Sequence, residues 1–66
     1  MNIEQQNQAR ENIKRLIEEQ GLSQPKLSEK AGIAFGTLSR ILRGKQDLTI
    51  QTAEKIADAL GLSVYD

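Results

Sequence analysis

Four glycines divide this 66-residue chain into segments, and each glycine follows apolar residues with the spacing of one helix face. These glycines are Gly21, Gly32, Gly44 and Gly61. A glycine directly after such a run is a common end of a helix. Strand signals are nearly absent, because the chain has one valine, one tyrosine, one phenylalanine and no alternating apolar run. The sequence therefore predicts an all-α fold.

We expect helices over about residues 5–20, from the N-cap Ser23 to about Ala31, over about 35–42, and after the N-cap Thr49. The apolar positions expected in the core are Ala9, Ile13, Leu16, Ile17, Leu27, Ala31, Ile33, Leu38, Ile41, Leu42, Ala53, Ile56, Ala57 and Leu60. Ser63 looks like a further N-cap, so the predicted compact bundle has four to five helices. Only three residues follow Ser63, and we expect residues 1–66 to be the N-terminal part of a longer protein. A natural short protein with a frayed tail is the alternative.

Composition excludes several function classes. The chain contains neither cysteine nor histidine, so it lacks disulfides, thiolate metal ligands and the commonest general base. Its serines have no histidine to activate them, and its carboxylate pairs have the spacing of a solvated helix surface. The sequence has no membrane-length apolar run and no apolar secretory segment. We therefore expect a cytoplasmic protein, nucleoid-associated in a bacterial host, with no enzymatic activity, cofactor or metal.

Charge is distributed unevenly although the net charge is zero. Residues 23–46 carry five basic residues and one acidic residue, a net charge of +4. Residues 1–22 and 47–66 carry net charges of −1 and −3. A basic centre between acidic flanks is typical of a domain with one face directed toward a polyanion.

The stretch from residue 24 to residue 44 has the spacing of two helices joined by a sharp turn. Counted from Gln24, the fifth residue is the small Ser28, where two helices must approach closely. The ninth is Gly32, which can adopt the left-handed conformation that the turn requires. Apolar residues at the fourth, tenth, fifteenth and eighteenth positions would fix the angle between the helices: Leu27, Ile33, Leu38 and Ile41. The predicted helix-turn-helix core is residues 23–43.

These residues resemble the phage-repressor-like helix-turn-helix family, the class of the lambda and 434 repressors and the Cro proteins. The resemblance covers about residues 9–64 and is carried by GLSQPKLSEKAGI, GTLSRILRGK and TAEKIADALGLS. It implies a five-helix bundle whose third helix enters the DNA major groove. It also implies homodimers that read the two half-sites of a palindromic operator, about one helical turn apart.

The resemblance also implies roles for individual residues. The positions that would face bases are Ala34, Phe35, Gly36, Ser39 and Arg40. The positions that would contact phosphates are Gln24, Thr37, Arg43 and Lys45.

The chemistry of these side chains leaves alternatives open. Arg40 can donate two hydrogen bonds to guanine, but it could instead be a solvated arginine paired with an acid. Arg43 and Lys45 could bind DNA phosphates, or they could be ordinary surface charges. Gln24 could donate to a phosphate, or it could simply be exposed to solvent. Phe35 could contact a thymine methyl group, or it could be a core or dimer-surface aromatic. Gly36 would permit close approach of the backbone.

The sequence thus predicts a sequence-specific regulator of transcription that binds double-stranded DNA, with a prophage-type repressor as the leading hypothesis. The alternative is an interaction module, such as an antitoxin or an accessory factor that uses the same fold to bind a protein. The neutral net charge and the weakly polar recognition positions keep this alternative open.

Overall fold

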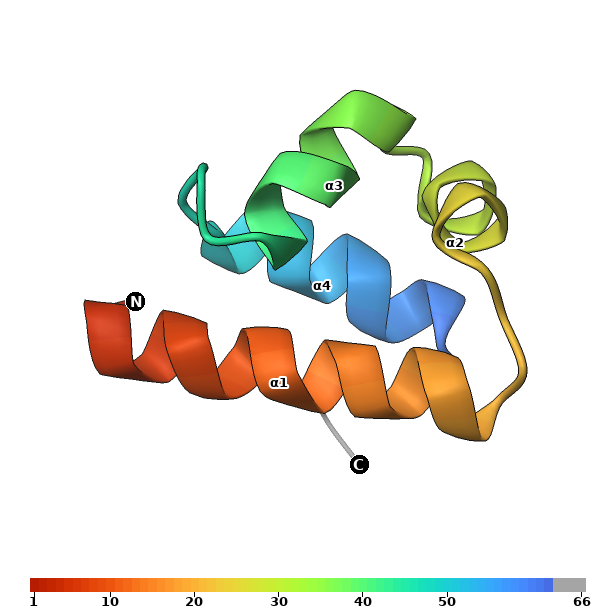
Figure 1. Ribbon diagram of the computed structural model, residues 1–66, viewed down its shortest axis with the longest axis horizontal. Helices are drawn as coiled ribbons and strands as arrows, with labels where there is room; N and C mark the ends of the chain where they lie inside the picture. Colours follow the sequence, from red (N-terminus) through yellow and green to blue (C-terminus); the bar gives the residue numbers. More distant parts are fainter. Residues whose placement is uncertain (63–66) are drawn as a thin grey trace.

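Four helices follow one another in the computed structural model, which describes residues 1–62 (Figure 1). They are α1 (Ile3–Glu19), α2 (Gln24–Ala31), α3 (Phe35–Leu42) and α4 (Ile50–Ala59). The predicted all-α class is confirmed, and α2 and α3 have the bounds that the sequence predicts. The expected fifth helix at Ser63 lies outside the described residues. Within residues 1–62 no helix is both long and apolar enough to cross a membrane.

The prediction that α1 begins at about residue 5 is wrong by two residues. The Asn2 side chain accepts a hydrogen bond from the backbone N–H of Gln5 (2.8 Å). The Gln5 side chain in turn accepts one from the backbone N–H of Asn2 (3.1 Å). This reciprocal pair satisfies N–H groups that a helix start otherwise leaves open. The apolar stripe begins only at Ala9 and therefore does not reveal this earlier start.

The core lies where the inner faces of the helices meet, and α2 packs against both α3 and α4. Its buried apolar residues are Ile13, Leu27, Leu38, Ile41, Leu42, Leu48, Ile56 and Leu60. The other apolar positions expected in the core are half-buried, and most of them pack against this cluster. Leu48 was not predicted, because it stands alone in the loop between α3 and α4 with no periodic neighbours.

The turn between α2 and α3 has the expected geometry. Gly32 adopts the left-handed conformation, with φ of 68°. The next N–H, from Ile33, donates to the Ser28 carbonyl (3.0 Å) and closes the end of α2. Ser28 is buried, as its small size predicts, and its hydroxyl donates to the Pro25 carbonyl (2.7 Å). The turn thereby sets the direction in which α3 leaves α2.

We expect Gly32→Ala to destabilise the domain by about 1–2 kcal/mol, the cost of a left-handed conformation for a residue with a Cβ. Apart from its chain neighbours, no atom of residues 1–62 lies within 4 Å of the position of that Cβ, so the cost comes from the backbone and not from a clash. Thermal unfolding should show a melting temperature lower by about 4–8 °C for each kcal/mol. Gly36→Ala is the matched control, because Gly36 lies in a helix with negative φ and alanine favours helices. Equal melting temperatures for the two variants would contradict the prediction.

Candidate nucleic-acid interface

Helix α3 has one buried face and one exposed face. Leu38, Ile41 and Leu42 are buried in the core. Phe35, Gly36 and Arg40 are exposed on the other side. In Figure 1, α3 forms the top of the bundle, while α1 runs along the bottom. The described chain therefore leaves the outer face of α3 open, as a helix that enters a DNA groove requires.

The five predicted base-facing residues occupy this side of α3 or its N-terminal end. Ala34 is the N-cap residue, Phe35 is the first helical residue, and both are exposed. Phe35 retains 49% of its accessible surface, so the core interpretation of this residue is wrong. The thymine-methyl and dimer-surface interpretations remain. Gly36 is exposed, and Ser39 is half-buried.

Arg40 lies back along α3 toward the N-terminus of the helix. Its Nε donates to Oε1 of Gln46 (3.0 Å), and its Nη2 donates to the Thr37 hydroxyl (3.4 Å). Its Nη1 would lie 3.4 Å from a Cβ built on Gly36, one turn earlier. Within residues 1–62 Arg40 forms no ion pair, so the alternative of an arginine paired with an acid is not found there.

The four predicted phosphate-contacting residues lie on three segments. Gln24 is the first residue of α2, and it is half-buried. Thr37 is a half-buried residue of the first turn of α3. Arg43 and Lys45 are exposed in the loop that follows α3. The backbone N–H of Lys45 donates to the Arg40 carbonyl (2.8 Å), which holds this loop against the end of α3.

The positive charge of the central segment is exposed and not neutralised by ion pairs among the described residues. The five basic residues between 23 and 46 are all exposed: Lys26, Lys30, Arg40, Arg43 and Lys45. The two ion pairs within residues 1–62 both lie on α1, between Lys14 and Glu11 (3.7 Å) and between Arg15 and Glu19 (3.8 Å). The cations of the central segment are thus free to attract an anionic ligand.

A family model described as helix-turn-helix matches residues 13–66. The chain belongs to the helix-turn-helix family. This is a family of DNA-binding transcription regulators, and its match covers α2, α3, α4 and most of the second half of α1. Comparison with curated proteins and with solved structures finds no match.

This helix-turn-helix protein also contains a buried cation that the sequence analysis did not single out. Arg10 on α1 is only 5% exposed. Its Nε donates to the Ile41 carbonyl in the last turn of α3 (2.7 Å), and its Nη2 donates to the Gln46 carbonyl in the following loop (3.0 Å). Its Nη1 donates to the Asn7 side chain (2.8 Å). The guanidinium therefore sits at the negative end of the α3 dipole and joins α1 to the loop after α3.

Gln6 extends this buried network. Its Oε1 accepts from Nη2 of Arg10 (3.3 Å) and from the backbone N–H of Leu48 (3.0 Å), and its Nε2 donates to the Met1 carbonyl (3.1 Å). A sequence signal for this network existed. Gln6 and Arg10 continue the stripe of Ile13 toward the N-terminus, at the same helical spacing. Two polar residues on the buried side of a helix indicate hydrogen bonds to another segment.

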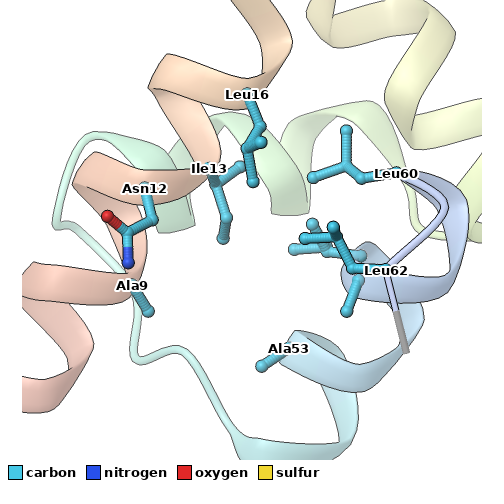
Figure 2. Close-up of a pocket in the computed structure, with 9 residues that line it drawn as sticks. Ala9, Asn12, Ile13, Leu16, Ala53, Leu60 and Leu62 are labelled. Atoms are coloured by element: carbon cyan, nitrogen blue, oxygen red, sulfur yellow. The ribbon is translucent and has the colours of Figure 1, made fainter. Parts of the chain in front are cut away.

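A shallow apolar groove lies between α1 and α4, with a volume of about 150 Å³ (Figure 2). It is lined by Ala9, Asn12, Ile13, Leu16, Ala53, Ile56, Ala57, Leu60 and Leu62. None of these side chains can donate or accept a proton at ordinary pH, so the groove offers no acid–base chemistry.

Proposed function

We propose that this helix-turn-helix protein is a sequence-specific regulator of transcription, of the prophage-type repressor kind, that reads the major groove of double-stranded DNA with α3. The observation that carries the proposal is the exposed face of α3 together with the cations beside it, which form no ion pair with any of residues 1–62. An α-helix fits the major groove, and the N-terminal residues of a recognition helix contact the base edges there.

In this proposal, five residues at or near the N-terminal half of α3 face the bases: Ala34, Phe35, Gly36, Ser39 and Arg40. Arg40 reads guanine through its O6 and N7 atoms. Phosphates are bound on both sides of the helix by Gln24, Thr37, Arg43 and Lys45. Gln24 suits this role because it starts α2, where backbone N–H groups and the helix dipole favour an anion.

The proposal includes a homodimer on DNA. A net charge of +4 on residues 23–46 neutralises only a few phosphates per subunit, so one domain alone binds weakly. Two copies on adjacent half-sites make twice as many contacts with the DNA and therefore bind more tightly. In helix-turn-helix dimers the centres of the two half-sites lie about 34–36 Å apart.

The test is a selection from a pool of random duplexes, followed by titration of the selected duplex and of a random duplex at several salt concentrations. We expect a palindrome with half-sites about 10 base pairs apart. We also expect tighter binding to the selected duplex than to the random one by about a thousandfold or more. Absence of binding to any duplex at low salt would refute the proposal.

Removing two of the loop cations should change the salt dependence of binding. In Arg43→Gln/Lys45→Gln, we expect the slope of log affinity against log salt to become shallower by about 2 per subunit. Each phosphate that is no longer contacted keeps its condensed counterion, so fewer counterions are released on binding. The loss should be similar on all duplexes. Lys14→Gln/Arg15→Gln on α1 is the matched control with the same change of net charge. An equal change of slope in both variants would show that only net charge matters and would remove the phosphate role of the loop.

The second candidate function is an interaction module, such as an antitoxin or an accessory factor, whose main ligand is a protein. The apolar groove between α1 and α4 favours it, because contiguous apolar surface suits a protein partner. The duplex selection separates the two candidates. A module that binds protein alone recovers no palindrome, whereas a repressor does.

A further inference from the structure

Two groups within residues 1–62 hold the guanidinium of Arg40 in place before any ligand is bound. Oε1 of Gln46 accepts from Nε (3.0 Å), and the Thr37 hydroxyl accepts from Nη2 (3.4 Å). A Cβ built on Gly36 would lie 3.4 Å from Nη1, an ordinary van der Waals contact, so the guanidinium also lies beside the Gly36 turn of α3.

Gln46 is itself anchored to the core through its backbone. Its carbonyl accepts from Nη2 of Arg10 (3.0 Å), and the buried guanidinium of Arg10 also donates to Ile41, Asn7 and Gln6. An exposed loop residue is ordinarily mobile. Here the backbone of Gln46 is tied to a buried cation on α1, while its side chain reaches the exposed arginine on α3. The chain of contacts runs from α1 through the loop to the outer face of α3.

We propose that Gln46 is a specificity-determining positioning residue, which holds the Arg40 guanidinium at the N-terminal end of α3 so that its free donors face the bases. This inference rests on the proposed DNA-binding function. Gln46 acts through Arg40, and it needs no contact of its own with DNA.

The hydrogen-bond inventory of Arg40 supports this role. A guanidinium has five N–H donors, and Gln46 and Thr37 take one each. Three donors remain, including both on Nη1, and a bidentate contact with guanine needs two. Holding the long side chain in place beforehand removes part of the entropy that binding would otherwise cost. The guanidinium is also carried toward the N-terminus of α3, the end at which a recognition helix contacts bases.

The experiment is the duplex selection from a random pool, carried out with the unaltered protein, Arg40→Ala and Gln46→Met. Methionine keeps the length of glutamine but removes the acceptor. We expect Gln46→Met to lower the base preference at one position of each half-site by about three- to tenfold, the effect of one lost hydrogen bond. This position should be the same one that Arg40→Ala affects. Affinity for a random duplex and the melting temperature should stay unchanged, because Gln46 is exposed.

Two further variants separate positioning from a purely structural role. Gln46→Glu retains the acceptor for Nε, so we expect it to keep the base preference while its added negative charge weakens binding to all duplexes alike. Gln8→Met is the matched control, since Gln8 is an exposed glutamine on α1 whose side chain, among the described residues, bonds only to Asn12 of the same helix.

If the unaltered protein selects a palindrome and Gln46→Met keeps its full preference, the positioning role is overturned and the proposed function stands. The positioning role is also overturned if Gln46→Met loses base preference equally at every position of the half-site, or if its melting temperature falls. If the unaltered protein selects no sequence, the proposed function itself fails.

Discussion

Arg10→Met is expected to lower the free energy of unfolding of this domain by about 2–5 kcal/mol. The guanidinium of Arg10 supplies donors to the Ile41 and Gln46 carbonyls and to the Gln6 side chain in a buried region. A hydrogen bond to a charged group is worth about 1.5–3 kcal/mol, and methionine offers no donor in return. The Gln46 carbonyl is left without another donor among residues 1–62, whereas the Ile41 carbonyl keeps the Gly44 N–H and Gln6 Oε1 keeps the Leu48 N–H. A domain of this size has a total free energy of unfolding of only about 3–10 kcal/mol. The loss is therefore a large fraction of the total, and the variant should melt well below the unaltered protein.

Urea and thermal unfolding followed by circular dichroism measure this effect. Arg15→Met is the matched control, because Arg15 is an exposed arginine on the same helix with only a surface ion pair to Glu19 (3.8 Å). We expect its stability to change by no more than about 0.5 kcal/mol. If the two variants unfold at the same urea concentration, the buried network of Arg10 has no net stabilising effect.

Arg40→Ala is expected to weaken binding to the selected operator by about 5- to 150-fold for each half-site, with little change on a random duplex. A bidentate contact between arginine and guanine is worth about 1–3 kcal/mol of discrimination, and alanine makes no such contact. The side chain of Arg40 is exposed, and within residues 1–62 it is hydrogen-bonded only to Gln46 and Thr37, so the fold should be retained. The circular dichroism spectrum and the melting temperature of the Arg40→Ala variant test whether the fold is retained.

Titration against the operator, an operator with that guanine changed, and a random duplex measures the discrimination. Lys45→Ala serves as the comparison, since a phosphate contact is lost equally on every sequence. Arg40→Lys should recover part of the affinity but little of the discrimination, because a lysine ammonium lacks the planar fork. Equal losses for Arg40→Ala on all three duplexes would make Arg40 a phosphate contact.

Much of the fold could be predicted from local signals. Ser23, Gly32 and Thr49 stand where the structure has an N-cap, a left-handed turn and another N-cap. Such positions are set by hydrogen bonds and backbone conformations that span only a few residues. The start of α1 was missed because its capping box lies outside the apolar stripe. A prediction that relied on the stripe alone therefore placed the helix start too late.

The candidate interface could be predicted in part. The exposed face of α3 follows from the positions of Leu38 and Ile41, because burying those residues turns Phe35 and Arg40 outward. The direction in which Arg40 lies could not be predicted, because its main partner, Gln46, belongs to an irregular loop. Residues in an irregular loop do not repeat with a regular spacing, so the sequence does not indicate which residues they contact.

The sequence by itself determined where the helices lie and which side of each faces the core, because spacing and capping act within a few residues. Only the tertiary structure decided what the polar side chains bind. Arg10 reaches carbonyls 31 and 36 residues further along the chain. Helical spacing says which side of a helix a residue occupies, but not which segment will be folded against it. The partners of Arg10, and through them the placement of Gln46 beside Arg40, exist only once the whole chain has packed.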